Sequence, residues 1–210
     1  SAVHDNTTHG VVLTSGNTGA TLVNDDVFEP GGSGLLLQGA GGVVQGGLYH
    51  NNAAYGIDAT LIDGQIFDAT ADSNGYWGIY TLGLVQGSTA YDNAVTSQYY
   101  SGIYATGTAA RLIDNVAYGN ANRIQVDGGA LAQDNRVFDN SIAGIMASNG
   151  YATSIDQIIG NQVYNNGIGI DSSITYYYDG PFVAQNLVYQ NATDGVLLNG
   201  LGAQAIVNTI

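Results

Sequence analysis

The sequence predicts an all-β fold, a parallel β-helix (solenoid) of about nine coils with roughly 23 residues each and no clear capping helix. Three observations indicate this fold. One phrase recurs along the whole chain at nearly constant spacing, and short alternating apolar segments are separated by Gly, Asn, Asp and Ser. A third is the lack of any window of about ten residues with a clean helical period. We expect residues 1–210 to form a single β-helix domain that is a segment of a longer protein.

The repeated phrase consists of an aromatic residue, in most repeats an asparagine two positions later, and then a glycine followed by an apolar residue. The aromatic residues, at an average step of about 23, are Phe28, Tyr49, Phe67, Tyr91, Tyr118, Phe138, Tyr164 and Tyr189. The asparagines are Asn51, Asn93, Asn120, Asn140, Asn166 and Asn191. The glycines are Gly10, Gly34, Gly56, Gly78, Gly102, Gly144, Gly169 and Gly195, and Arg123 takes the place of one more.

Each repeat contains short alternating segments, for example LIDNVAY (112–118) and QIIGNQVY (157–164), which is the pattern of strands. A sharp bend between strands places one residue in the left-handed region, which Asn and Gly tolerate best. Asparagines stacked at a coil spacing of about 4.8 Å can hydrogen-bond along the axis as a ladder. We expect the aromatic and apolar columns to stack inside the coils in the same way.

Two copies of the phrase, NRVFDNSIAGI (135–145) and NQVYNNGIGI (161–170), carry a resemblance to a known family. The chain resembles the right-handed parallel β-helix repeat family, the pectin-lyase-like solenoids, over essentially its whole length. The resemblance implies right-handed coils. It implies little about function, because this fold hosts many chemistries.

The charge of the chain excludes several partners. There is no lysine, and three arginines face sixteen aspartates and one glutamate, which gives a formal net charge of −14. Nucleic acid and anionic membrane surfaces need Lys and Arg to neutralise phosphate, so neither is expected as a partner. No apolar run approaches the ~18 residues of a membrane span, so no membrane insertion is expected. We expect an extracellular or cell-surface protein whose partner is a polysaccharide.

The residue two positions after each glycine is expected to point outward, because side chains alternate along a strand. This column reads Val12, Leu36, Asp58, Tyr80, Tyr104, Gln125, Met146, Asp171 and Leu197. Flat aromatic rings and a few polar groups are the usual means of gripping sugar rings. The predicted polysaccharide-binding residues are Tyr55, Asp58, Tyr76, Trp77, Tyr80, Tyr99, Tyr100 and Tyr104. A non-catalytic role fits this pattern. The alternative to polysaccharide binding is that these rings only cover a flank of the solenoid.

One segment, YGIDAT (55–60), resembles a YGFDPH-type segment of bacterial mannuronan C5-epimerases. Tyr55 and Asp58 match that pattern and are the candidate catalytic residues, whereas Thr60 stands where the family has a histidine. A uronate-polysaccharide C5-epimerase or lyase module is therefore the alternative function. A second alternative is an architectural solenoid that associates end to end into a filament through its open strand edges.

Calcium is the expected cofactor, if there is one, because it prefers oxygen ligands and would relieve repulsion between stacked carboxylates. The candidate ligands are Asp68, Asp92, Asp114 and Asp134, with Asp68 and Asp92 predicted to share one column and Asp114 and Asp134 another. The alternative is that these are solvated turn aspartates. A further aromatic run, Tyr176, Tyr177 and Tyr178, is expected to be a loop covering the solenoid.

Overall fold

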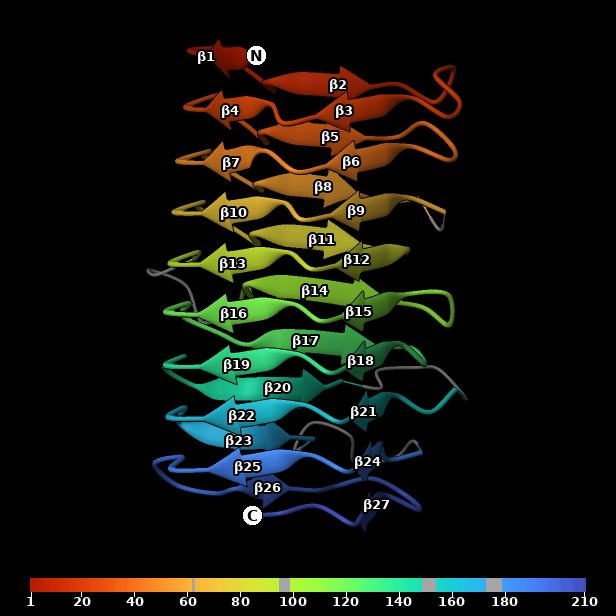
Figure 1. Cartoon of the computed structure of the whole chain (residues 1–210), viewed down its shortest axis with the longest axis vertical. Coiled ribbons are helices and arrows are strands. Elements are labelled where there is room, and N and C mark those ends of the chain that lie inside the picture. Colours follow the sequence, from red (N-terminus) through yellow and green to blue (C-terminus); the bar gives the residue numbers. More distant parts are fainter. Residues whose placement is uncertain (62, 95–98, 149–153, 173–178) are drawn as a thin grey trace.

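The computed structural model describes residues 1–61, 63–94, 99–148, 154–172 and 179–210, and within these ranges the chain forms strands and turns without a helix. The strands wind into a solenoid in which each coil contributes one strand to each of three nine-stranded parallel sheets (Figure 1). The predicted parallel β-helix is therefore confirmed. The run Tyr176 to Tyr178 lies outside the described residues.

Each strand pairs in parallel with the strand three places later in the chain, so every sheet runs along the whole axis. Sheet A contains β1 (Ala2–His4), β4 (Asp26–Phe28), β7 (Leu48–His50), β10 (Thr70–Asp72), β13 (Thr89–Tyr91), β16 (Val116–Tyr118), β19 (Arg136–Phe138), β22 (Gln162–Tyr164) and β25 (Leu187–Tyr189).

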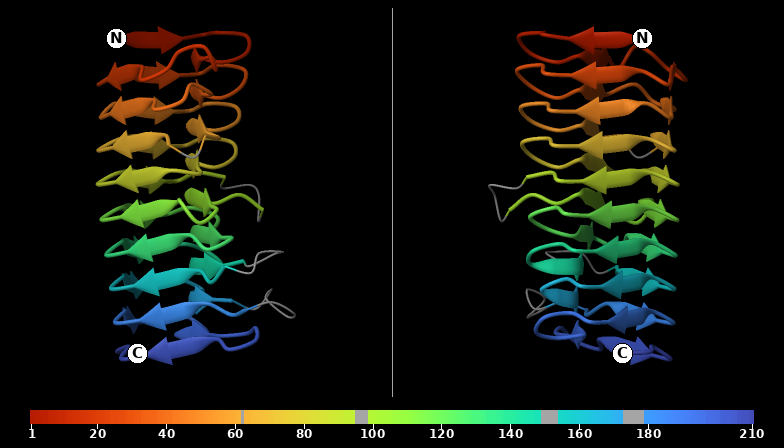
Figure 2. Two further views of the ribbon diagram at one scale, coloured as in Figure 1. Left: turned by 90° about the vertical axis from the view of Figure 1, so that its right-hand side faces the viewer. Right: turned by 60° about the vertical axis from the view of Figure 1, so that its left-hand side comes forward.

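Sheet B, which carries the predicted binding face, contains β2 (Val11–Leu13), β5 (Leu35–Leu37), β8 (Ile57–Ala59), β11 (Ile79–Thr81), β14 (Ile103–Thr106), β17 (Ile124–Asp127), β20 (Ala143–Ala147), β23 (Ile168–Asp171) and β26 (Val196–Leu197). Sheet C contains β3 (Thr21–Val23), β6 (Val43–Gln45), β9 (Gln65–Phe67), β12 (Leu84–Gln86), β15 (Arg111–Ile113), β18 (Leu131–Gln133), β21 (Gln157–Ile159), β24 (Phe182–Ala184) and β27 (Gln204–Ile206). Figure 2 shows from two further sides how successive strands lie above one another.

The core is a set of apolar columns inside the coils. In sheet B, one inward-pointing residue of each strand lies in register with the next and is fully buried from the second to the eighth coil. A single buried isoleucine contributes roughly 1.5–3 kcal/mol. This column consists of Leu35, Ile57, Ile79, Ile103, Ile124, Ile145 and Ile170. Sheet C adds Ile66, Val85, Leu112, Ala132, Ile158 and Val183, and sheet A adds Val27, Tyr49, Ala71, Ala90, Ala117, Val137, Val163 and Val188.

The turns after sheets A and C each begin with one residue in the left-handed region, with φ between 51° and 71°. Asp, Asn and Gly fill most of these positions because they tolerate that conformation best. After sheet A the residues are Asp5, Glu29, Asn51, Ser73, Asp92, Gly119, Asp139, Asn165 and Gln190. After sheet C they are Asn24, Gly46, Asp68, Gly87, Asp114, Asp134, Gly160, Gln185 and Val207.

From the third coil on, the residue after the left-handed position that ends sheet A forms a ladder of asparagines along the turn between sheets A and B, buried as far as Asn166. In each step the side-chain amide donates to the Oδ1 atom of the next asparagine, over 2.6 to 3.2 Å. The ladder consists of Asn52, Asn74, Asn93, Asn120, Asn140, Asn166 and Asn191. The predicted ladder is confirmed, with one correction: its member in the third coil is Asn52, and Asn51 is the left-handed residue before it.

A second asparagine ladder runs along the turn between sheets C and A, which the sequence reasoning missed. Its amide steps measure 2.9 to 3.0 Å and connect Asn115, Asn135, Asn161, Asn186 and Asn208. The signal was present in the sequence, because the phrase NRVFDN begins with one ladder residue and ends with the other.

The recurrent glycine before each sheet B strand is explained by space. A Cβ atom on Gly78 would lie 2.6 Å from the carbonyl oxygen of Gly102 and 2.7 Å from the ladder amide of Asn93. Gly56 is crowded in the same way by Gly78 and Asn74. A side chain at these positions would therefore push apart two coils and the first ladder.

The expectation that the repeated aromatic residues stack inside the coils is wrong. They are the last residues of the sheet A strands, half-buried on the outer surface, and the column is His4, Phe28, His50, Asp72, Tyr91, Tyr118, Phe138, Tyr164 and Tyr189. Tyr49 points inward one residue earlier, and Phe67 ends β9 in sheet C. Because the turns vary in length, spacing alone does not show that Tyr49 and Phe67 occupy strand positions different from those of the other aromatic residues. A shift of one residue along a strand moves a side chain to the other face of the sheet.

Candidate functional site

The outward column of sheet B lies where the sequence predicted it. Strand pairing places Leu36 next to Asp58, Asp58 next to Tyr80, and Tyr80 next to Tyr104. The flanking residues of each strand point into the core, as Ile57 and Ala59 do on either side of Asp58. The middle residues of β8, β11 and β14 therefore form one outward row along the axis.

Six aromatic side chains join around this row, and we call them the aromatic band: Tyr55, Tyr76, Trp77, Tyr80, Tyr100 and Tyr104. Trp77 is central, because its ring stacks on Tyr55 at 5.4 Å and on Tyr104 at 5.5 Å between centroids. Tyr80 and Tyr104 stack at 5.0 Å with an angle of 15° between their planes. The band therefore spans three consecutive coils as one connected cluster.

The edge of the band is the part most open to solvent. Tyr76 is 40% exposed and stacks on Tyr100 at 4.4 Å, while Tyr100 meets Trp77 edge-on at 4.6 Å. Tyr99, next in the chain to this edge, is 84% exposed. Rings in the middle of the band cover one another, so the outer rings and the hydroxyl groups are the surfaces offered to a ligand.

Asp58 lies at the N-terminal side of the band with one carboxylate oxygen, Oδ1, buried and without a hydrogen-bond partner. Burial raises the pKa of Asp58, and a positive charge on His9 acts in the opposite direction. Burial, followed by the charge of Asp58, also raises the pKa of Tyr55 and of Tyr80. The indole Nε1 of Trp77 is likewise buried without a partner. Two unpaired polar atoms thus accompany the rings.

A second carboxylate, Asp127 at the end of β17, borders the band on its C-terminal side. The Tyr104 hydroxyl donates to Asp127 Oδ2 over 3.3 Å, and burial together with the Asp127 charge raises the pKa of Tyr104 to about 12. Beyond it, Gln125 accepts from the Ser101 hydroxyl at 3.2 Å and donates to the Ser148 hydroxyl at 3.0 Å. Sequence reasoning had missed Asp127, because its distance from Tyr104 depends on coil register.

The two residues predicted as catalytic, Tyr55 and Asp58, lie on the same face of sheet B, close enough for the Asp58 charge to act on the Tyr55 hydroxyl. Thr60 is exposed at the following turn. The histidine that acts on Asp58 is His9, from the first coil, whose Nδ1 accepts from the Ser33 backbone N–H over 3.2 Å. The geometry therefore offers a carboxylate, a phenol and an imidazole on one face.

Arg123, at the position where the repeat normally has glycine, lies at the margin of sheet B beyond the band. Burial lowers the pKa of Arg123 to about 10, although the charge of Asp171 acts in the opposite direction. Its Nε atom is buried without a hydrogen-bond partner. The positive charge of Arg123 is thus partly balanced by Asp171 and lies apart from Asp58.

The aromatic column of sheet A presents a different surface from the band. Its rings stack from Tyr91 to Tyr189 with centroids 4.9 to 5.1 Å apart and nearly parallel planes. Arg136 covers Phe138 at 4.7 Å and donates to the Tyr164 hydroxyl over 2.9 Å. Because each ring face is occupied by its neighbour, this column offers ring edges and serves coil stacking.

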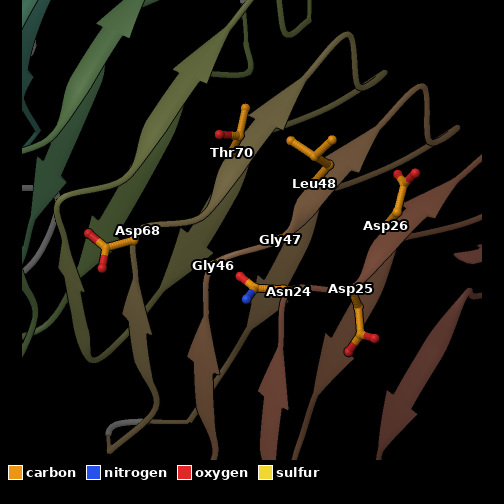
Figure 3. Close-up of a pocket in the computed structure, with 8 residues that line it drawn as sticks. All are labelled: Asn24, Asp25, Asp26, Gly46, Gly47, Leu48, Asp68 and Thr70. Carbon is orange, nitrogen blue, oxygen red and sulfur yellow. The ribbon is translucent and has the colours of Figure 1, made fainter. Parts of the chain in front are cut away.

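An open pocket of about 390 Å³ lies on the turn between sheets C and A, and Gly46 and Gly47 are among its lining residues (Figure 3). Figure 3 shows the carboxylates of Asp25, Asp26 and Asp68 pointing in different directions. Asp25 accepts from the terminal ammonium group at 3.1 Å and Asp26 lies 3.0 Å from the His50 ring. The other residues that line the pocket are Asn24, Leu48 and Thr70.

Of the predicted calcium ligands, Asp114 and Asp134 share a column as expected, whereas Asp68 and Asp92 do not. Asp68 follows sheet C, in line with Asp114 and Asp134, whereas Asp92 follows sheet A on a different turn. The error arose from placing Phe67 in the wrong column. Within the described ranges, no three acidic or histidine side chains come close enough together to hold a metal ion.

The described residues also include no helix long and apolar enough to cross a lipid bilayer.

Comparison with solved structures finds a likeness to the crystal structure of the periplasmic alginate epimerase AlgG, with a TM-score of 0.60 and 16% sequence identity. The match covers 89% of this chain and 50% of the epimerase chain, so this chain spans about half of that protein. At this identity the likeness shows a shared fold. No curated protein matches the sequence. The profile of the right-handed beta helix region matches residues 1–155, about three quarters of the chain. The chain therefore belongs to the right-handed β-helix family.

Proposed function

We propose that the chain is a carbohydrate-contacting module of an extracellular or cell-surface protein, with the aromatic band of sheet B as its polysaccharide-binding face. The observation that carries the proposal is the joining of six aromatic rings and Asp58 on one outward face across β8, β11 and β14. Tyrosine and tryptophan combine apolar surface for a sugar ring with a polar tip that orients it. The likeness to a periplasmic alginate epimerase supports a saccharide partner and a location outside the cytoplasm.

Replacing Tyr80 by alanine is expected to weaken glycan binding by roughly tenfold or more, because the band loses its middle hydroxyl group and the ring that supports Tyr55 and Tyr104. Trp77 is the sole tryptophan and stacks within the band, so its fluorescence reports binding directly. The measurement is a titration with neutral, acidic and amino-bearing oligosaccharides. Tyr118→Ala is the matched control, because Tyr118 is also an outward, half-buried tyrosine in a ring stack, but on sheet A.

Two results would contradict this proposal. One is a flat titration across the whole panel with the unmodified protein. The other is an equal loss of affinity in Tyr80→Ala and Tyr118→Ala, which would indicate a general loss of structure rather than a local contact.

A uronate epimerase or lyase centred on Tyr55 and Asp58 is the alternative function. Abstraction of a sugar C5 proton needs a base and a group that neutralises the adjacent carboxylate. Tyr55 and Asp58 lie together on the band side, whereas the nearest arginine of sheet B, Arg123, is at the margin beside Asp171. We therefore expect unchanged proton NMR spectra after incubation with alginate or pectate. Epimerised or unsaturated products would establish the enzyme instead.

End-to-end association of copies is the second alternative, and the last coil supplies an observation in its favour. In the last coil, Leu201 and Val207 are 65% and 79% exposed, so two large apolar side chains are available there for contact with another copy. If copies associate through this end, Val207→Asp should lower the average mass measured by light scattering at high concentration. Ile155→Asp is the matched control, because Ile155 is also an exposed apolar residue but lies just before β21, two sheet C strands away from the last one. A strict monomer at all concentrations would contradict this alternative.

A further inference from the structure

We propose that the aromatic band takes glycans that carry free, protonated amino groups in preference to uronates and to neutral chains, and that Asp58 receives the ammonium group. This inference rests on the proposed carbohydrate-binding function and adds the charge class of the sugar. The reason is that acidic side chains border the aromatic band, whereas the arginines of the chain lie elsewhere.

The position of Asp58 leaves a carboxylate oxygen without a donor. Asp58 is the outward residue of β8, in register with Tyr80 of β11, and its Oδ1 atom is buried without a hydrogen bond. A desolvated carboxylate that lacks a donor is costly to the folded protein. An ammonium group supplies up to three donors and an opposite charge, and charge-assisted hydrogen bonds are about twice as strong as neutral ones.

The band as a whole lies in a negative potential. Asp58 and Asp127 border it on opposite sides, and the charges of both act on the Tyr80 hydroxyl between them, adding to the effect of burial in raising the pKa of Tyr80. Asp127 also accepts the hydroxyl hydrogen of Tyr104. A carboxylate of a uronate laid along this row would meet two like charges, whereas an amino group would be attracted by both.

The basic groups of the chain offset this potential only weakly. Arg111 lies in sheet C and donates to the carbonyl oxygens of Thr108 and Ala110. Arg136 lies in sheet A over Phe138. Arg123 is beside Asp171. The sequence has no lysine, so His9 is the remaining basic group that acts on Asp58. The net charge of −14 adds long-range repulsion of polyanions.

The test compares two oligosaccharides with the same backbone: fully deacetylated β-1,4-linked glucosamine oligomers, and their neutral N-acetylated counterparts. Binding is followed by Trp77 fluorescence and calorimetry at about pH 6, roughly two units above the ordinary pKa of an aspartate carboxyl group, because burial raises the pKa of Asp58. We expect the amino form to bind at least about tenfold more tightly. Asp58→Asn should abolish that preference, so that the amino and the neutral forms bind within about twofold of each other. Asp114→Asn is the matched control, because it removes the same charge from an exposed turn between sheets C and A.

Each outcome decides between the two proposals. Equal binding of both forms, or a preference unaffected by Asp58→Asn, would overturn the inference while keeping carbohydrate binding. Tighter binding of oligouronates would do the same. Two further results would show unspecific charge attraction and overturn the inference. One is that Tyr80→Ala binds the amino form with unchanged affinity, and the other is that a lysine peptide of equal charge binds with the same affinity as the amino form. No binding of any glycan would overturn both proposals.

Discussion

Replacing Asn120 by alanine is expected to lower the free energy of unfolding by about 4 kcal/mol, since several buried polar groups would lose their partners at once. Asn120 Oδ1 accepts from both the backbone N–H and the side-chain amide of Asn93, each over 3.0 Å. Its own amide donates to Asn140 and to the carbonyl oxygens of Ala90 and Tyr118. A loss of this size is a large share of the roughly 5–15 kcal/mol that stabilises a typical domain.

Asn191→Ala provides the matched control at the end of the same ladder. Asn191 accepts from Asn166 in the same manner, but this step is only partly buried, so water can replace the lost bonds. We expect a loss of about 1 kcal/mol there. Guanidinium chloride unfolding followed by circular dichroism and Trp77 fluorescence measures both variants. Equal losses at Asn120 and Asn191 would contradict the argument that burial makes the ladder strong.

Replacing Asp156 by asparagine is expected to remove most of a pH dependence of stability. Asp156 is fully buried in the last position before β21, where the two preceding coils have Ala110 and Ala130. Its Oδ1 accepts from the backbone N–H groups of Gly129 and Ala130 over 2.8 and 3.1 Å, while Oδ2 has no partner. Burial above all, and the charge of Asp127, raise the pKa of Asp156 to about 7, although the two N–H groups act in the opposite direction.

The sign of the effect follows from proton binding. Between the ordinary aspartate pKa of about 3.9 and the folded value of about 7, the folded protein keeps a proton that the unfolded chain has lost. Stability therefore falls as pH rises through this window, by an amount on the order of 3–4 kcal/mol, and is level above it. The Asp156→Asn variant carries no charge at this position at any pH. It should therefore gain stability relative to the original protein from pH 4 to pH 8, by about that amount.

Urea unfolding at several pH values tests this expectation. Asp114→Asn is the control, because Asp114 is exposed and its left-handed backbone suits asparagine equally well. The comparison between variants isolates the contribution of Asp156 from that of the rest of the chain. Parallel stability curves for the Asp156→Asn variant and the original protein would contradict a buried, protonated Asp156.

The sequence predicted the outward column of sheet B correctly because glycine marks a fixed point in every coil. Gly56, Gly78 and Gly102 face the first asparagine ladder and the next coil, so the count from glycine to the outward residue never varies. The aromatic residues gave no such fixed point. Tyr49 and Phe67 lie near the right spacing but in other positions, because the turns before them differ in length.

The sequence predicted the rings of the candidate site and Asp58, and it missed Asp127 and His9. Tyr80 and Tyr104 are neighbours once the coils are in register, and their stacking follows from a coil rise near 4.8 Å. The contact of Tyr104 with Asp127 joins different strand positions in neighbouring coils. The effect of His9 on Asp58 reaches across two coils. Neither can be read from the spacing within one repeat.

The sequence by itself determined that this protein is a solenoid and that Asp58, Tyr80 and Tyr104 face outward together. Those properties depend on local conformation and on strand alternation, which each repeat carries within itself. The tertiary structure decided that the repeated aromatic column lies outside, that a second asparagine ladder exists, and that Asp58 and Asp156 each keep an unpaired oxygen. These depend on which coil lies above which residue, and the variable turns leave that to the packing of the whole stack.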